Sequence, residues 1–437
     1  MNSKQSYKKI LSTTIFYIII AGIIMIIITP IYFLFTISLM SDQEAYDWPT
    51  RLVPSFFNYF RLELSKPKLS ENDKYIISIY SPVKKKYITL LETNDFAKLQ
   101  TFIRRKTNSL IKKENFDKQL KKLKDLSEKN PEKLEKVLSE RINLNKKLNI
   151  LNVEIGRLME KIDMAEKIGG MDELIKQLKN EIEIKNNEIN KTEKLLKENE
   201  KIFDKLGTVH FTISKKLLDN YITFFRVTSD AIPALIRSIE VAFLTVLISL
   251  TIGGMAGYAF ARYYFKGKNL LKLSVLFVRM FPGISIAMPM VIILINMGFY
   301  DKPIGLSLVY SVGQIGMTIW ITASIFMGIS VELEEAAMVF GTSRFGAFMK
   351  ITLPLALPGL AASAMYAFIG SWAETAQAIV LTQFNPTFPV VVYQTLVGAK
   401  GLINLSAAGG VSLALPAIIF TLIIRKYILQ MWGGVRV

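Results

Sequence analysis

Long apolar runs limit how this chain can fold more than any other feature. Six runs carry no charge, or in one case a single carboxylate: 10–41, 241–261, 280–300, 303–331, 361–381 and 401–424. About 20 apolar residues are enough for an α-helix to cross the hydrocarbon core of a bilayer. The runs therefore predict an all-α membrane protein with six transmembrane helices. The first run is too long for the apolar core of a signal peptide, so we expect it to be retained.

The charges are concentrated in one part of the chain. Of 54 Lys and Arg and 36 Asp and Glu, 39 and 31 lie between Asp42 and Glu240, which leaves 20 charges for the other 238 residues. This segregation predicts three parts: the N-terminus with the first transmembrane helix (1–41), a charged insert (42–230) and a five-helix core (231–437).

The loop charges predict an orientation. With an even number of spans, both termini share one side, and that side holds twelve Lys and Arg against two in the opposite short loops. Because Lys and Arg are retained on the cytoplasmic side, we expect a multi-pass protein of the plasma membrane. Both termini would be cytoplasmic, and the insert would be extracellular.

Most of the insert has the apolar spacing of a coiled coil. Apolar residues repeat at three- and four-residue spacing on both sides of a Gly-Gly pair, at Val137, Leu144, Leu148, Leu151, Ile155, Leu158, Ile162 and Ala165, and at Met171, Ile175, Leu178, Ile182, Ile189, Leu196, Phe203 and Leu206. This period is that of a helix–helix seam. The two arms predict an antiparallel hairpin over 132–206, and each arm would be roughly 55 Å long.

The rest of the insert predicts a small mixed α/β base. The segments 75–80, 86–91 and 209–213 have the composition of strands, and 95–129 is a Lys-rich helical stretch. The mixed signs of charge and the lack of an aromatic platform argue against nucleic acid as a partner. The chain has no cysteine, and its one histidine, His210, has no clustered ligands, so we expect no metal site.

One polar segment, 332–358, lies between two apolar runs. Unpaired backbone groups cost several kcal/mol each in hydrocarbon, so this segment must lie at a membrane face. From Glu334 it reads EEAAMVFGTSRFGAFMKITLPLALP. The pattern is E-A-A, three residues, Gly, nine residues and Ile-x-Leu-Pro.

This pattern closely resembles the cytoplasmic coupling loop of permeases in binding-protein-dependent ABC importers. The matching positions are Glu335, Ala336, Ala337, Gly341, Ile351, Leu353 and Pro354. The family usually has Asp directly before the glycine, where this chain has Phe340. The segments 237–262, 281–289 and 433–436 are similar to maltose-type, carbohydrate-class permeases, whereas roughly 61–216 has no counterpart in them.

The resemblance implies a function for which the chain needs partners. It implies a second permease subunit, two P-loop ATPase subunits, an extracellular binding protein and membrane lipid, with no cofactor in this chain. ATP and Mg would bind the partner ATPase, and the chain itself has no G-x-x-x-x-G-K-[ST] motif and is not expected to be an enzyme. In such a loop, Glu335 would pair with a cation of the ATPase, and Leu353-Pro354 would end the short helix.

Trp372 and Glu374 are the candidates for a substrate path. A carboxylate in mid-span costs about 2.5 to 3.5 kcal/mol on insertion scales, so Glu374 is expected to face water or a partner. Trp372 could stack on a sugar face, but an interhelical hydrogen bond is an equally simple explanation for Glu374.

Three classes of protein are compatible with the composition. The first is a permease subunit of an ATP-driven importer for a carbohydrate or similar polar solute. The second is a membrane-anchored coiled-coil scaffold or adhesin, which needs no coupling loop. The third is a secondary transporter, which would show internal repeats. The E-A-A spacing favours the first.

Overall fold

The computed structural model describes residues 2–49, 51–65, 74–168, 171–398 and 402–432. It has two compact units: the membrane unit, Met1–Met40 with Leu218–Val437, and the insert domain, Ser41–Leu217. The predicted insert, 42–230, is too long at its C-terminal end. The reason is that α7 (Asp219–Val227) packs against α17 of the membrane unit.

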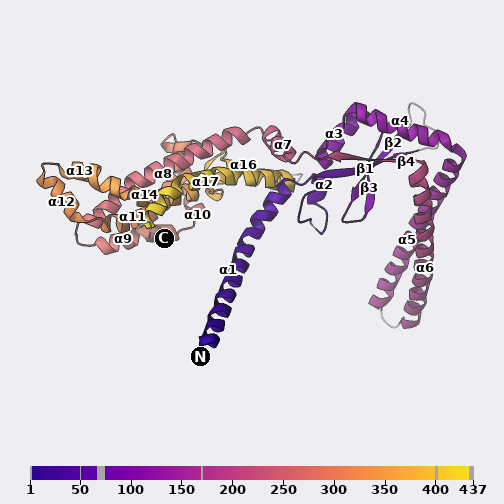
Figure 1. The fold of residues 1–437 in the computed structure, drawn as a ribbon, viewed down its shortest axis with the longest axis horizontal. Helices are drawn as coiled ribbons and strands as arrows, with labels where there is room; N and C mark the ends of the chain where they lie inside the picture. The colour runs from indigo at the N-terminus through magenta and orange to yellow at the C-terminus, as the bar shows by residue number, and fades with distance from the viewer. Residues whose placement is uncertain (1, 50, 66–73, 169–170, 399–401, 433–437) are drawn as a thin grey trace. The chain divides into compact units, whose positions relative to one another are not determined.

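All the regular secondary structure described in the membrane unit is helical (Figure 1). Its long helices are α1 (Asn2–Ser38), α8 (Ala231–Arg262), α11 (Pro303–Met327), α14 (Leu353–Trp372) and α17 (Ile403–Trp432). Its shorter elements are α7, α9 (Lys268–Phe277), η1 (Val278–Met280), α10 (Gly283–Asn296), α12 (Val331–Val339), α13 (Arg344–Ala347), η2 (Phe348–Thr352), α15 (Ala376–Leu381) and α16 (Phe388–Val397).

Five helices of the described chain are long and apolar enough to cross a membrane. The helix pair Lys268–Met280 and Gly283–Asn296 would make a sixth crossing if it were one span, but it bends by 93° at its break. The third predicted span, 280–300, is therefore not a single long helix. Pro282 lies at this break, and the residue before a proline is disfavoured in the helical conformation.

The fifth predicted span, 361–381, has the wrong boundaries. The crossing helix covers Arg344–Trp372, and α15 is a separate short helix. The chain leaves the helix at Ala373, and Glu374 Oε1 accepts the backbone N–H of Gln377, in the first turn of α15, at 3.0 Å.

Helices α8 and α11 pack closely through small residues. A Cβ added to Gly253 would collide with Thr318, and one added to Gly257 would collide with Thr322. The hydroxyl of Thr322 donates to the carbonyl of Gly253 at 3.2 Å. The G-x-x-x-G spacing of this helix thus serves helix packing.

The insert domain contains all the described strands. Its elements are α2 (Asp42–Ala45), β1 (Phe57–Leu64), β2 (Tyr75–Ser81), β3 (Lys86–Thr93), α3 (Phe96–Thr107), α4 (Lys113–Lys129), α5 (Pro131–Ile168), α6 (Asp172–Leu206) and β4 (Thr208–Ser214). The strands form an antiparallel sheet in the order β3-β2-β1-β4. Three of them lie at the predicted segments, but β1, one of the two interior strands, was not predicted.

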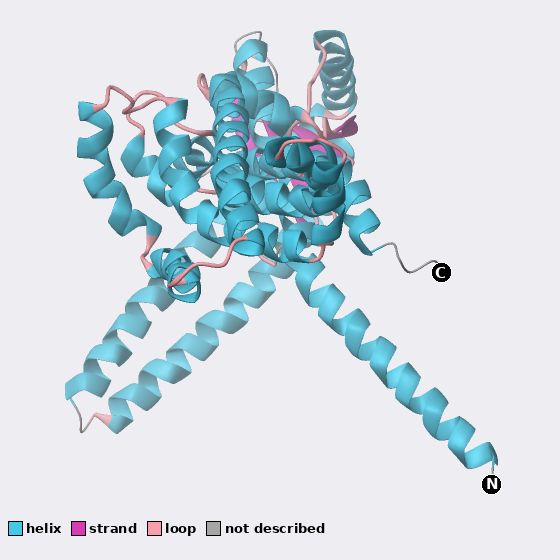
Figure 2. Ribbon diagram, turned by 90° about the vertical axis from the view of Figure 1, so that its left-hand side faces the viewer, coloured by secondary structure: helices cyan, strands magenta, loops and turns pink. Residues whose placement is uncertain are grey.

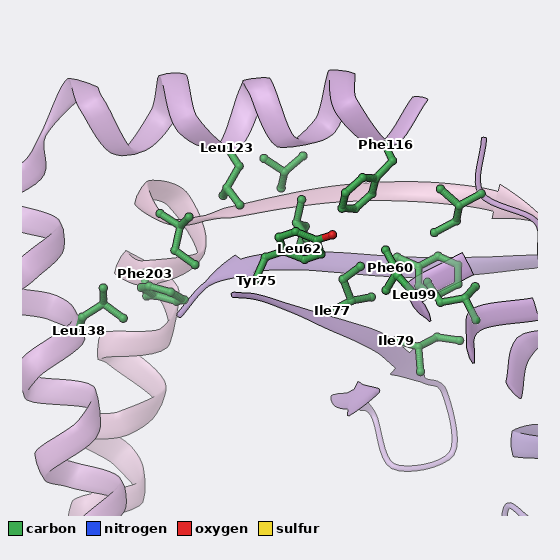
Figure 3. Packing of buried hydrophobic residues seen from close by; sticks show 14 of the residues in the cluster. Phe60, Leu62, Tyr75, Ile77, Ile79, Leu99, Phe116, Leu123, Leu138 and Phe203 are labelled. Atoms are coloured by element: carbon green, nitrogen blue, oxygen red, sulfur yellow. The ribbon is translucent and has the colours of Figure 1, made fainter. Parts of the chain in front are cut away.

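One face of the sheet carries the core of the insert domain. Figure 3 shows Phe116 and Leu123 of α4 pointing toward Leu62 and Tyr75 of the sheet. The single predicted helical stretch, 95–129, is two helices, because Asn108 adopts a left-handed conformation (φ 53°) and ends α3. Two shorter helices therefore cover the sheet face.

The arms predicted from the apolar spacing are the helices α5 and α6, which lie side by side (Figures 1 and 2). Polar pairs cross between them, such as Lys185 with Glu154 and Lys147 with Glu188, each at 2.7 Å. The root of the pair belongs to the core of the sheet, to which it contributes Leu134, Val137, Leu138 and Phe203. A boundary at residue 132 therefore does not separate the hairpin from the base, because it would take these side chains out of the core of the sheet.

The two ends of the insert domain are joined by a buried ion pair. The ammonium of Lys215 is fully buried and binds Glu44 Oε2. Burial alone would raise the pKa of Glu44, but Lys215, with hydrogen bonds from Ser55 and Ser41, holds that pKa below its ordinary value of 4.5. Glu44 also makes a capping box with Ser41 at the start of α2.

On the side of the membrane unit, one amide holds the same two chain segments together. Asn220 Nδ2 donates to the carbonyl oxygens of Ser38 at 2.8 Å and Met40 at 2.6 Å. The chain therefore leaves the membrane unit after Met40 and re-enters it at α7 through adjacent points.

Candidate functional site

The polar segment between α11 and α14 folds into short, capped helices. Ser330 Oγ accepts the N–H of Glu332 at 3.2 Å and caps α12, and Ser343 Oγ accepts the N–H of Gly346 at 3.1 Å and caps α13. Between them, Gly341 has φ +87°, a conformation that favours glycine. The turn closes through backbone bonds, including Thr342 N–H to the carbonyl of Ala337 at 3.1 Å.

A buried ion pair fastens this segment to the helix bundle. Arg262, the last residue of α8, donates from Nε to Glu334 Oε1 at 2.7 Å, and its Nη2 also lies 2.7 Å from that oxygen. The same guanidinium donates to the carbonyls of Phe326 at 2.8 Å and Ile329 at 3.0 Å. One side chain thus links the ends of α8, α11 and α12.

Aromatic packing supports the ion pair. The hydroxyl of Tyr258 donates to Glu334 Oε2 at 2.7 Å. Its ring packs edge-on against Phe326 and Phe348, with centroids 5.5 and 4.6 Å away. Burial alone would raise the pKa of Glu334, but the hydrogen bonds from Arg262 and Tyr258 hold that pKa below 4.5, so the carboxylate stays ionised.

The structure distributes the predicted motif residues between two surfaces. Glu335 is exposed and forms no ion pair within the described part of the chain, so its charge is available to a partner. The other exposed members are Ala336, Gly341 and Pro354, whereas Ala337 is buried and Ile351 and Leu353 are partly buried.

Leu353-Pro354 does not end a helix, contrary to expectation. It begins α14, which continues directly from the π-helical turn η2. Proline is well tolerated in the first turn of a helix, where its missing N–H is not needed. The segment therefore continues into the span Arg344–Trp372.

Large apolar side chains are exposed beside Glu335. Val339 is 85% exposed, Phe340 89% and Phe345 72%. We call these three residues the apolar tip. Phe340 occupies the position where the resembled family usually has Asp, and the turn forms without a side-chain bond from that position.

Trp372 and Glu374 lie in different surroundings. Trp372 is 4% exposed, stacks on Phe368 with centroids 5.6 Å apart, and donates from Nε1 to the carbonyl of Leu413 at 2.9 Å. Its ring is therefore used in packing α14 against α17. Glu374 is half-buried in the break between α14 and α15, not in the middle of a continuous helix.

A groove of about 820 Å³ runs along α11 and α14. Its lining is mostly apolar and includes Met317, Trp320, Ile325 and Pro358. The close approach of the two helices at one end is set by Gly359, where an added Cβ would collide with Ile325.

The contact between Arg262 and Glu334 was not predicted. Both residues are visible in the sequence, one at the end of an apolar run and the other directly before the E-A-A motif. Their separation of 72 residues gives no local signal for a pair. The only indication of this contact in the sequence was an arginine directly after a predicted span.

Comparison with known proteins adds a family match. Residues 249–431 match the family model described as "Binding-protein-dependent transport system inner membrane component". The trehalose transport system permease protein SugB of Mycobacterium tuberculosis is 35% identical over 216 residues, which cover 48% of this chain and 78% of that protein. The trehalose/maltose permease protein MalG of Thermococcus litoralis is 32% identical over 224 residues, covering 49% and 79%.

Among solved structures, a chain of a bacterial ABC transporter that imports the acidic polysaccharide alginate matches 49% of this chain and 82% of its own length. The TM-score is 0.41 and the sequence identity is 20%.

Proposed function

The chain belongs to the family of binding-protein-dependent transport system inner membrane components, and we propose that it moves a carbohydrate or similar polar solute into the cell as a permease subunit of an ATP-driven importer. Trehalose, maltose and arabinooligosaccharides are the solutes named for its relatives. The protein is a multi-pass membrane protein, and a scaffold or adhesin is not favoured.

The segment that starts with α12 carries this proposal. It presents Glu335 and the apolar tip outward, while Arg262 and Glu334 fasten it to α8 and α11. A helix held so firmly on one side and so exposed on the other is suited to transmit force from a partner. Movement of an ATPase against α12 would be passed directly to the crossing helices.

The partners follow from this role. A second permease subunit would complete the solute path, and two P-loop ATPase subunits would bind ATP and Mg and contact α12. The apolar tip would fill a cleft on the ATPase, so Phe340 would supply an apolar contact. Both termini and α12 would be cytoplasmic, and the insert domain would be extracellular.

The insert domain would meet the solute-binding protein. It enters the chain directly after α1, on the face opposite to α12 in the predicted topology, where a loaded binding protein must dock. At about 1.5 Å per residue, the 38 residues of α5 span roughly 57 Å. A helix pair of that length is a suitable guide or tether for the binding protein. An inert spacer, in contrast, would not change the affinity of the complex for the binding protein.

The test is uptake by the reconstituted complex. The chain is co-purified with its partner permease and ATPase and placed in proteoliposomes with ATP on the ATPase side. Uptake of [14C]trehalose or [14C]maltose is then measured with and without the binding protein. ATP-dependent uptake that requires the binding protein supports the proposal, and absence of uptake of both sugars contradicts the assignment to carbohydrate.

A further inference from the structure

Tyr310 on α11 has an unusual environment for a hydroxyl group. The residue is 3% exposed and packs with apolar side chains, among them Leu294 of α10 and Leu381 of α15. Its hydroxyl has no hydrogen-bond partner among the described residues. A buried hydroxyl left unpaired costs about 1 to 3 kcal/mol, so a role inside this chain does not account for it.

Two glutamines nearby show the same feature. Gln314 lies one helical turn from Tyr310, and its amide is seated over Gly370 of α14. Gln377 of α15 is seated over Gly283, the first residue of α10. The side-chain carbonyl oxygens of both glutamines are buried and lack a partner within the described chain.

The glycines make these positions possible. A Cβ on Gly370 would collide with the amide of Gln314, and one on Gly283 would collide with that of Gln377. Each glutamine amide thus lies directly against a glycine. This close contact with the glycines limits the directions from which the two side-chain carbonyl oxygens can accept a hydrogen bond.

Glu374 adds a carboxylate to the group. Its Oε1 accepts the N–H of Gln377 at 3.0 Å, so it lies beside that residue in the break between α14 and α15. Ala378, the residue after Gln377, belongs to the same buried cluster as Tyr310. We call Tyr310, Gln314, Glu374 and Gln377 the polar cluster.

The unpaired atoms of the polar cluster are mostly acceptors. Two amide oxygens and a carboxylate accept hydrogen bonds, and the tyrosine hydroxyl can accept or donate. A neutral solute with many hydroxyl groups has the matching donors. An anionic solute would be repelled by Glu374, and an apolar one would leave all of these groups unpaired.

We propose that the polar cluster is a contact point for the hydroxyl groups of a neutral carbohydrate as it crosses the membrane unit. This inference rests on the proposed function and assigns solute contact to residues of this subunit. Gln314 is one helical turn from Met317, which lines the groove between α11 and α14.

The test uses three substitutions that remove a hydrogen-bonding group and nearly keep the size of the side chain. Tyr310→Phe, Gln314→Met and Gln377→Met are each introduced into the complete reconstituted complex. Uptake of [14C]trehalose and [14C]maltose, ATP hydrolysis stimulated by loaded binding protein, and thermal stability are measured. Tyr393→Phe and Gln394→Met, both exposed on α16, are the matched controls.

Solute contact predicts that each variant lowers uptake about three- to tenfold, the loss expected for one hydrogen bond, while the controls keep wild-type uptake. Stimulated ATP hydrolysis and stability should stay near normal, because no contact within the chain is removed. Tyr310→Phe is decisive, since it deletes only an unpaired hydroxyl and cannot empty the core.

Two results would overturn the inference. Unchanged uptake in all three variants would show that water satisfies these groups. Loss of assembly with the partner permease would show that they bind that subunit instead. A failure of the proposed function is distinguishable, because the wild-type complex would then take up neither sugar before any variant is compared.

Discussion

Arg262 and Glu334 form a buried ion pair with Nε and Nη2 of the arginine each 2.7 Å from one carboxylate oxygen. The pair joins the end of α8 to α12, and the other Arg262 donors hold the end of α11. The exposed α12 therefore cannot tilt independently of the bundle. This coupling gives the first of five predictions.

Arg262→Met should detach α12 from the bundle. Removing one partner of a buried ion pair costs about 3 to 5 kcal/mol, because the remaining charge is left uncompensated. Hydrogen exchange of 331–347 should become faster while that of α14 stays slow, and uptake should fall. Arg425→Met, which removes an exposed arginine on α17, is the control. Equal protection of α12 in wild type and Arg262→Met would contradict the role of the pair.

Glu335→Lys should abolish ATP-driven uptake without preventing membrane insertion. The side chain is exposed, so reversing its charge disturbs the surface offered to an ATPase and no internal contact. Uptake by proteoliposomes and the amount of protein in the membrane fraction are the measurements. Glu332→Lys, another exposed carboxylate on α12, is the control, and wild-type uptake by Glu335→Lys would refute the assignment of this loop.

Deleting 132–206 should leave the membrane unit intact but unfold the sheet of the insert domain. The deletion removes Leu134, Val137, Leu138 and Phe203 from its core, and each large buried side chain lost costs about 2 to 5 kcal/mol. Deleting only 152–187, with a four-glycine link, should keep the sheet folded. Hydrogen exchange of β1 and β2 distinguishes the two, and equal protection in both deletions would show that the hairpin root is dispensable.

The shorter deletion also tests docking of the binding protein. If the distal hairpin guides that protein, removing 152–187 should raise the concentration of loaded binding protein needed for half-maximal uptake. The maximal rate should stay near normal, because α12 and the ATPase are untouched. Titration of uptake against binding protein is the measurement. An unchanged half-maximal concentration leaves the hairpin as an inert spacer.

The insert domain should lose stability in acid through Glu44. Its folded pKa lies below the ordinary 4.5 because Lys215 and hydrogen bonds outweigh its burial, and Arg51 lies 3.6 Å away. The stabilisation is present above pH 4.5 and is lost as pH falls through the lowered folded pKa. Glu44→Gln should therefore weaken the protection of β4 strongly at pH 7 and progressively less as the pH falls through the lowered folded pKa. If Glu44→Gln weakened the protection of β4 equally at every pH, the predicted direction of the pH dependence would be wrong.

The sequence predicted the elements whose signal is local and long. The apolar runs indicated the crossing helices, and the apolar spacing of 132–206 indicated both arms. At the predicted positions Leu151, Ile155, Leu158 and Leu178 are buried between α5 and α6. The E-A-A spacing likewise located the exposed segment and its family. In these stretches, periodicity alone determines which side chains must leave water.

Tertiary structure decided what depends on residues far apart in the chain. It interrupted the helix within the third run at Pro282 and within the fifth run at Ala373. It also placed β1 in the interior of the sheet, where it pairs with β4, a strand about 150 residues away in the sequence. The ion pair of Arg262 with Glu334 and the contact of Gln314 with Gly370 likewise join residues far apart in the sequence. Such contacts depend on which helices pack together, and that choice is made by the free energy of the whole unit, not by any local pattern.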